Sequence, residues 1–243
     1  MGAARDAGPD AAMLLAAGLG TRMRPLTDAT PKPLIRVAGK TLIDYALDRF
    51  AQAGVTQAVV NVHYRADQME AHLAQRPAPP RIVISDERGA LLETGGGLKK
   101  ALPHFGAKPF YCANTDAILV DGAREGCRAL AERWDGAAMD ALLLLIPIEA
   151  TSGYAGKGDF DQDKDGRIAL RAGARAPYVF TGLQIIAPAL VAEGPDGPFS
   201  TRLLWDKAAA RGRLYGAVID GFWLHVGDPA GLEEAERRLA GRA

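Results

Sequence analysis

Short apolar runs and amphipathic stretches alternate along the chain from about residue 12 to residue 146. Continuous apolar or β-branched runs predict buried strands, and these runs span residues 12–17, 56–62, 81–85, 109–113 and 139–146. Helical spacing of apolar residues predicts the intervening helices, at residues 41–53, 66–74, 95–102 and 120–133. Repeated strand–helix units of this kind predict a mostly parallel sheet with right-handed crossovers and helices on both faces.

The pattern changes beyond Pro147, where strands become more frequent than helices. Residues 157–160 and 167–170 read as paired strands around Asp165-Gly166, a favoured hairpin dipeptide. Further strands are predicted at residues 178–186, 214–219 and 222–226, and helices at 201–211 and 229–239. We expect one α/β domain over residues 1–243, Rossmann-like with a small antiparallel elaboration, that begins with a flexible tail at residues 1–11.

Composition excludes two classes of protein. Of the 243 residues, 48% are hydrophobic, which argues against intrinsic disorder. Lys and Arg number 29 and so do Asp and Glu, so the formal net charge is zero. A protein that binds nucleic acid without sequence preference would carry a surplus of cations to neutralise phosphates. We therefore expect no nucleic-acid partner.

The two cysteines and the apolar runs bear on location. Cys112 and Cys127 have no C-x-x-C spacing and no neighbouring His, so we expect buried apolar side chains in a reducing, cytoplasmic compartment. The N-terminus has charges of both signs and no long apolar segment before Pro9, unlike a signal peptide. The longest apolar run, residues 141–148, is far too short to span a bilayer. We expect no membrane partner, and the sequence leaves the oligomeric state open.

A glycine loop follows the first strand and carries the clearest chemistry. Gly18 and Gly20 allow the backbone to approach phosphates closely and to present N–H groups to them. Arg22 and Lys32 add cations suited to phosphate oxygens. From residue 18 to residue 40, five Lys or Arg stand against one Asp. In a protein of zero net charge, this local surplus points to a small phosphorylated ligand.

Two well-known phosphate motifs do not fit. The dinucleotide fingerprint G-x-G-x-x-G would need glycine where Met23 stands. No suitable acidic residue follows the second strand, which also disfavours a dinucleotide-dependent oxidoreductase. The G-K-[ST] of the P-loop is absent from the sequence.

The opening motif, G-x-G-T-R-M-R-P-L-T followed by P-K-P-L at residues 31–34, resembles the signature of the sugar nucleotidyltransferases. The resemblance extends to about residue 239. Its later motifs are Gly39-Lys40, Leu42-Ile43, Leu92-Glu-Thr-Gly-Gly-Gly97, Asn114-Thr-Asp116 and Gly221-Phe-Trp-Leu-His-Val-Gly227. The Leu-Glu-Thr-Gly-Gly-Gly form is most similar to the branch that uses UTP and N-acetylmuramate 1-phosphate in cell-wall recycling. The mannose-1-phosphate and heptose-1-phosphate guanylyltransferase branches remain open.

The resemblance implies that a sugar 1-phosphate attacks the α-phosphorus of a nucleoside triphosphate and that pyrophosphate leaves. It implies that Arg22 steadies the leaving phosphates and that Lys32 offsets the charge growing between the substrates. The residues that it places around the nucleotide are Ala16, Ala17, Gly18, Gly20, Thr21, Arg22, Glu87, Thr94 and Gly95. Those that it places around the sugar are Asn114, Gly156, Asp159, Thr181, Gly182 and Trp223. Residues 12–148 are then the nucleotide-binding half and 149–243 the sugar-binding half.

The resemblance also implies a Mg²⁺ cofactor. Asp116 ends a predicted strand at the carboxyl edge of the sheet, where open α/β folds bind ligands, and its hard carboxylate suits Mg²⁺. Members of the family commonly carry a second aspartate at the position of His225, and imidazole is a poorer ligand for Mg²⁺. We expect Asp116 to be catalytic and a metal ligand, with His225 as a second, weaker candidate ligand. The histidine at this position also leaves open an alternative function, that of a catalytically impaired protein that binds a nucleotide-sugar.

Overall fold

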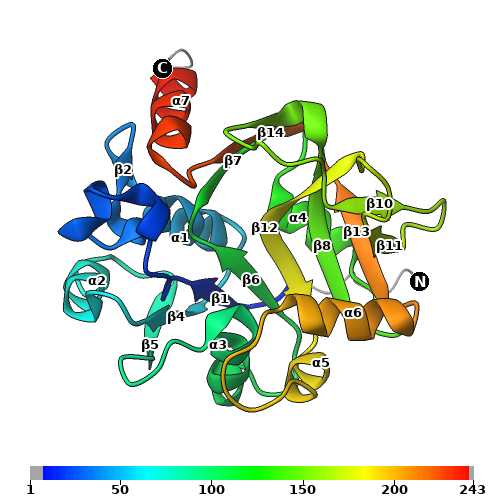
Figure 1. Ribbon diagram of the computed structural model, residues 1–243. Coiled ribbons are helices and arrows are strands. Elements are labelled where there is room, and N and C mark those ends of the chain that lie inside the picture. The colour runs from blue at the N-terminus through cyan, green and yellow to red at the C-terminus, as the bar shows by residue number, and fades with distance from the viewer. Residues whose placement is uncertain (1–7, 241–243) are drawn as a thin grey trace.

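The structure is a computed structural model that describes residues 8–240. Nine strands within this range form the main sheet, in the order β11-β10-β12-β6-β1-β4-β5, and β12 also pairs with β8, which pairs with β13 (Figure 1). Their bounds are β1 Ala11–Leu15, β4 Gln57–Val62, β5 Arg81–Asp86, β6 Phe110–Asn114, β8 Ala141–Pro147, β10 Phe160–Gln162, β11 Ile168–Leu170, β12 Tyr178–Ile186 and β13 Leu214–Val218.

Strand directions confirm the expected fold class. β1 pairs in parallel with β4 and β6, β4 pairs in parallel with β5, and β8 pairs in parallel with β13. β12 runs antiparallel to both β6 and β8, and the β10–β11 hairpin joins it. The sheet is therefore mostly parallel with an antiparallel insertion, and the carboxyl ends of β1, β4 and β6 meet at one edge.

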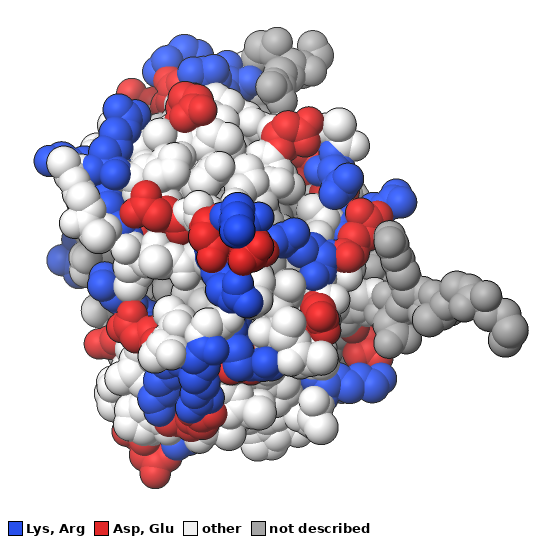
Figure 2. All heavy atoms as spheres, turned by 90° about the vertical axis from the view of Figure 1, so that its right-hand side faces the viewer, with Lys and Arg blue, Asp and Glu red and all other residues white. Residues whose placement is uncertain are grey.

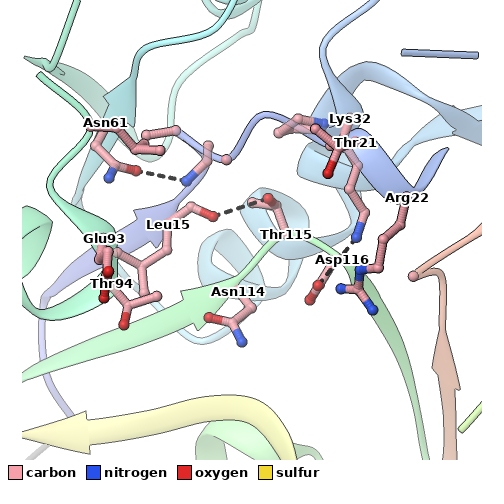
Figure 3. Close-up of a pocket in the computed structure, with 17 residues that line it drawn as sticks. Leu15, Thr21, Arg22, Lys32, Asn61, Glu93, Thr94, Asn114, Thr115 and Asp116 are labelled. Carbon is pink, nitrogen blue, oxygen red and sulfur yellow. Dashed lines mark hydrogen bonds and ion pairs between the residues drawn. The ribbon is translucent and has the colours of Figure 1, made fainter. Parts of the chain in front are cut away.

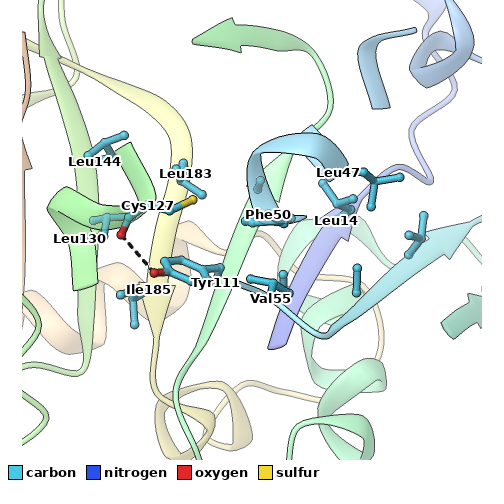
Figure 4. Packing of buried hydrophobic residues seen from close by; sticks show 14 of the residues in the cluster. Leu14, Leu47, Phe50, Val55, Tyr111, Cys127, Leu130, Leu144, Leu183 and Ile185 are labelled. Atoms are coloured by element: carbon cyan, nitrogen blue, oxygen red, sulfur yellow. Dashed lines mark hydrogen bonds between the residues drawn. The ribbon is translucent and has the colours of Figure 1, made fainter. Parts of the chain in front are cut away.

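Helices cover both faces of this sheet. α1 (Leu42–Gln52), α2 (Ala66–Leu73) and α4 (Gly126–Arg133) pack on one face, and α3 (Glu93–Ala101), α5 (Pro188–Ala192) and α6 (Arg202–Ala210) pack on the other. Figure 4 shows the first interface, where Phe50 of α1 stacks on Tyr111 of β6 with ring centroids 5.8 Å apart. Each such buried side chain contributes about 1.5–3 kcal/mol. These layers hold the strand ends in place.

A second, smaller sheet lies beside the edge where the parallel strands end. β14 (Gly221–His225) pairs with β7 (Ala117–Asp121) on one side and with β9 (Thr151–Ser152) on the other. α7 (Pro229–Ala240) and the hairpin of β2 (Arg36–Val37) and β3 (Lys40–Thr41) pack there as well, through a cluster that includes Met23, Leu224 and Ala235. Because β7 directly follows Asp116, this sheet stands at the mouth of the site.

Some elements differ from the sequence prediction. The helix predicted at residues 120–133 is wrong in its first part, because residues 117–121 form β7 and the helix begins at Gly126. β7 gains its partner from β14, about a hundred residues later, so no local pattern reveals it. The short α5 was not predicted. Residues 1–7 of the predicted tail lie outside the described residues, and Ala11 already belongs to β1.

The surface matches the neutral composition. Figure 2 shows a face of the molecule on which Lys and Arg side chains are interspersed with Asp and Glu. Among residues 8–240, no helix is long and apolar enough to cross a membrane.

Candidate active site

A cavity of about 330 Å³ lies at the sheet edge where β1 and β6 end (Figure 3). It is lined by Leu15, Ala16, Ala17, Gly18, Gly20, Thr21, Arg22, Lys32, Pro33, Asn61, Leu91, Glu93, Thr94, Asn114, Thr115, Asp116 and Gly227. In Figure 3, Lys32 and Arg22 lie on one side with Asp116, and Asn61, Glu93 and Thr94 lie on the other. We call these sides the cationic end and the amide end of the cavity.

The glycine loop forms one wall. After β1 ends at Leu15, the chain turns at Gly20, whose φ of 64° suits glycine. The Thr27 hydroxyl donates to the Gly20 carbonyl at 2.8 Å, which holds the turn closed. A Cβ at Gly18 would meet nothing within 4 Å, so the backbone there is open to a ligand. The loop therefore presents bare backbone to the cavity, as expected from its sequence.

The start of α3 forms the opposite wall, and its glycines explain the Leu92–Gly97 motif. The Gly95 and Gly96 N–H groups both donate to the Phe199 carbonyl, at 2.8 and 3.2 Å. A Cβ at Gly95 would lie 2.3 Å from the Phe199 ring, and one at Gly96 would lie 2.4 Å from the Gly197 carbonyl oxygen. The glycines thus let α3 pack tightly against residues 197–199. Thr94 lines the cavity, whereas Gly95 lies behind the wall.

The cationic end holds the charged candidates. Lys32 Nζ lies 3.2 Å from the Asp116 carboxylate, and only 12% of the Lys32 side chain is exposed. Arg22, in the short 3-10 helix η1 (Thr21–Met23), has no hydrogen bond or ion pair to any residue between 8 and 240, and it lies on the same side of the cavity as Asp116 in Figure 3. The Thr115 hydroxyl donates to the Leu15 carbonyl at 3.1 Å, which ties β6 to β1 next to these charges. Two cations and one carboxylate thus converge at this end.

His225 is the last residue of β14 and lies close to Asp116. The Val226 N–H donates to the Asp116 carbonyl at 2.9 Å, which brings the end of β14 to this point. Burial lowers the pKa of His225 below its ordinary value, and the nearby Lys32 and Arg22 oppose the imidazolium as well, so that the attraction of Asp116 is outweighed. The ring is therefore neutral near pH 7. Its Nδ1 is buried without a hydrogen-bond partner among the described residues.

Trp223 lies under His225 and does not line the cavity. Its ring stacks on His225 with centroids 5.3 Å apart, and its indole N–H donates to the Thr181 carbonyl at 2.8 Å. Thr181 and Gly182 form a bulge in β12 and, with Asn114, line a smaller cavity next to the main one. Gly182 has a φ of 91°, and a Cβ there would lie 3.2 Å from the Asn114 Cβ. The structure thus joins four of the predicted sugar residues.

Gly156 and Asp159 line neither cavity, but their segment touches this group, since the Tyr154 ring lies edge-on to Trp223 with centroids 5.9 Å apart. The Asp159 carboxylate accepts from the Tyr154 hydroxyl and from the Phe180 N–H, both at 2.9 Å. These bonds brace residues 153–159 against β12, and they use both carboxylate oxygens. Gly156 packs against the Tyr154 ring.

Glu87 lies behind the amide end, where it is 1% exposed and donor groups from Asn61 and Leu92 surround it. Asn61 also lines the cavity, although no motif had predicted it. Its signal was a lone polar residue within the apolar run Val59-Val60-Asn61-Val62. Other lining residues without a predicted role are Leu15, Pro33, Leu91, Glu93, Thr115 and Gly227.

A metal ion would find few protein ligands here. No group of three or more His, Cys, Asp or Glu side chains within residues 8–240 could hold one. Asp116 offers a hard carboxylate, and the neutral His225 offers an unpartnered buried nitrogen. This set suits a divalent ion that takes most of its ligands from substrate phosphates and water, as Mg²⁺ does.

Known proteins resemble this chain over most of its length. Residues 12–144 match the model of the MobA-like NTP transferase domain. The chain is 50% identical over 236 residues to an N-acetylmuramate alpha-1-phosphate uridylyltransferase of Caulobacter vibrioides, which covers 96% of this chain and 98% of that protein. It is 28% identical to the mannose-1-phosphate guanylyltransferase catalytic subunit beta of Drosophila pseudoobscura pseudoobscura, over 90% of this chain and 59% of that one. A UDP-glucose pyrophosphorylase solved with UDP-glucose shares the fold, with a TM-score of 0.78 at 15% identity, over 97% of this chain and all of that one.

Proposed function

The chain belongs to the family of MobA-like NTP transferase domains, and we propose that it transfers the uridylyl group of UTP to N-acetylmuramate α-1-phosphate. The products are UDP-N-acetylmuramate and pyrophosphate. The observation that carries the proposal is the 50% identity to a uridylyltransferase of that name across almost the whole of both chains. The mannose-1-phosphate guanylyltransferase relative is more distant, at 28% identity.

The cavity supports this reaction class by its distribution of charge. The phosphate oxygen of the sugar 1-phosphate forms a new bond to the α-phosphorus of UTP, and the bond from that phosphorus to the bridging oxygen of pyrophosphate breaks. Negative charge grows on the leaving pyrophosphate and on the α-phosphoryl oxygens. Catalysis of such a step is mainly positioning and charge stabilisation. Arg22 and Lys32 supply the fixed positive charge at the cationic end.

The chain's residues take distinct roles in the proposal. Arg22 binds the β- and γ-phosphates, because its guanidinium has no protein partner among the described residues. Lys32 leaves its ion pair with Asp116 to contact the α-phosphoryl oxygens between the two substrates. Ala17 and Gly18 present backbone to the nucleoside, and Thr94 closes the opposite side. Around the sugar, the proposed contacts are Asn114, Thr181 and Gly182, which line the smaller cavity, while Gly156, Asp159 and Trp223 are proposed to support that pocket from behind.

Nucleotidyltransferases of this kind generally use a divalent metal ion, and we assign Mg²⁺ here. Asp116 would hold it, with His225 as a second ligand, and it would neutralise triphosphate charge. We also propose that the protein lies in the cytoplasm, in keeping with its free, buried Cys112 and Cys127.

Pyrophosphate release tests the proposal. The protein is mixed with Mg²⁺, one of UTP, GTP, CTP or dTTP, and one of several sugar 1-phosphates that include those of N-acetylmuramate, mannose and heptose. We expect the highest kcat/KM for UTP with N-acetylmuramate 1-phosphate. A higher kcat/KM for GTP with another sugar phosphate would make the protein a guanylyltransferase. Nucleotide binding without turnover in any pairing would favour a nucleotide-sugar binding protein and overturn the enzyme assignment.

A further inference from the structure

Asn61 connects the glycine loop to a buried carboxylate. Its Oδ1 accepts the Ala16 N–H at 2.6 Å, and its Nδ2 donates to Glu87 Oε1 at 2.8 Å. The second Glu87 oxygen, Oε2, accepts the Leu92 N–H at 3.4 Å. Asn61 and Glu87 are 2% and 1% exposed, so breaking one of these bonds would leave a buried polar group without a partner. The result is a continuous chain of hydrogen bonds from the end of β1 to the start of the α3 wall.

This chain of bonds has a defined direction. The group of Ala16 that faces Asn61 is its backbone N–H, which can only donate. The Asn61 oxygen must therefore point toward Ala16, and the amide NH₂ must point away from it. Glu87 is the acceptor that this NH₂ meets. A side chain at residue 87 that donated toward Asn61 would turn the amide over and leave the Ala16 N–H unpaired. Glu87 therefore sets the orientation of Asn61, and Asn61 sets the position of the Ala16 peptide.

Gly97 presses on both side chains from α3. A Cβ there would lie 2.9 Å from Asn61 Nδ2 and 2.9 Å from Glu87 Oε1. The pair is thus confined on the helix side by bare backbone, and neither side chain can shift toward α3. Figure 3 shows Asn61 at the edge of the cavity, with a dashed line for the hydrogen bond that its Oδ1 accepts.

We infer that Asn61 and Glu87 form a positioning pair that fixes the Ala16–Gly18 backbone for the nucleotide, and that Glu87 acts through Asn61 without touching the base. The inference rests on the proposed function, since it assigns UTP to this end of the cavity. It also differs from what the family resemblance implied for Glu87, which was placed among the residues around the nucleotide itself. The two roles predict different outcomes when the polarity of the pair is reversed.

Reversing the polarity is the test. Asn61→Asp places two carboxylates against each other, so at mildly alkaline pH it displaces the pair, leaves the Ala16 N–H without a stable acceptor and weakens UTP binding by about tenfold or more. In the Asn61→Asp/Glu87→Gln double variant, the new carboxylate at position 61 accepts from the Ala16 N–H and from the new amide at position 87. The oxygen of that amide accepts the Leu92 N–H. Every bond has a donor and an acceptor again, so we expect UTP affinity within about threefold of wild type.

Isothermal titration with UTP measures the dissociation constants, and steady-state kinetics measures KM for each substrate. Supporting results are recovery of UTP affinity in the double variant and a rise in KM for UTP but not for the sugar phosphate in Asn61→Asp. A double variant that binds UTP no better than Asn61→Asp overturns the inference. So does an Asn61→Asp protein that keeps wild-type UTP affinity at a pH at which both carboxylates are ionised, because a proton shared between them would preserve both bonds. If Asn61→Asp does not fold, Asn61→Ser replaces it, and wild-type UTP affinity in Asn61→Ser overturns the inference.

A matched control separates positioning from general stability. Gln184 is 2% exposed in β12 and accepts the Trp205 indole N–H at 2.9 Å, away from the cavity. Gln184→Glu is the same amide-to-acid change in the core, so it should lower the melting temperature and leave UTP affinity unchanged. Failure of the proposed function is distinguishable, because it shows as absent turnover in the wild type. In that case, the affinities of the single and double variants are measured with whichever of UTP, GTP, CTP and dTTP binds the wild type.

Discussion

The two ends of the cavity differ in whether their polar groups have partners within the protein. At the amide end, Ala16, Asn61 and Glu87 satisfy one another in a buried chain of hydrogen bonds. At the cationic end, Arg22 has no partner among residues 8–240, and the buried His225 Nδ1 neither accepts nor donates a bond there. This difference indicates that the paired groups fix the geometry of the site, whereas the unpaired groups are available to bind a ligand.

The free-energy cost of an unpaired buried polar group explains why the two ends differ. A buried polar group without a partner costs about 1–3 kcal/mol, and a fold accepts that cost only where a ligand or function compensates for it. The Lys32–Asp116 ion pair is intermediate between the two ends, since its members satisfy each other and can be drawn apart by phosphate. The amide end therefore determines where the nucleotide sits, and the cationic end supplies interactions that strengthen as the reaction proceeds.

Lys32→Ala should have the largest effect. Loss of one preorganised group that stabilises transition-state charge costs about 10²–10³ in rate, so kcat/KM should fall by that factor with little change in melting temperature. The matched control is Lys108→Ala, which removes an exposed lysine paired with Asp10 on the surface, away from the cavity. A Lys32→Ala enzyme with near-wild-type kcat/KM would show that the cationic end is not the reacting end.

Gly97→Ala should have a smaller and different effect, because it acts on the amide end. The added methyl would lie 2.9 Å from both Asn61 and Glu87, so the pair must shift and carry the Ala16 peptide with it. We expect KM for UTP to rise about tenfold while kcat changes little, although alanine favours the helix over glycine. Gly173→Ala serves as control, since a Cβ there would come no closer than 3.9 Å to any atom beyond its chain neighbours. A fall in kcat with unchanged KM for UTP would contradict the division between the two ends.

Local patterns predicted the amide end and the cationic end unequally well. The glycine loop and Lys32 lie close together in sequence, so their shared wall could be predicted from residues 18–34. The cavity also contains Asp116, as the strand-end argument predicted, and Asn114, which the family resemblance placed around the sugar. Glu87 was identified as a nucleotide residue, but its depth behind Asn61 depends on how α3 packs, and no motif encodes that.

The small sheet was the least predictable part. β7 was partly assigned to a helix because its apolar residues also fit helical spacing, and its true partner lies on β14. His225 was noticed because it departs from a carboxylate position, yet its orphaned Nδ1 and its stacking on Trp223 come from tertiary packing. Sequence motifs thus predict which residues gather at the edge, whereas distant pairing decides which of them stay unsatisfied.

His225→Asp should have the smallest effect and sharpens the account of the cationic end. A carboxylate is a better ligand for Mg²⁺ than a neutral imidazole, so the concentration of Mg²⁺ that gives half-maximal activity should fall. We expect kcat to stay within about threefold of wild type, because Lys32 and Arg22 still supply the positive charge. His225→Asn is the control, since it keeps a polar side chain but adds no charge. An unchanged Mg²⁺ requirement in His225→Asp would show that residue 225 only fills the wall beside Trp223, and that Asp116 and the triphosphate hold the ion without it.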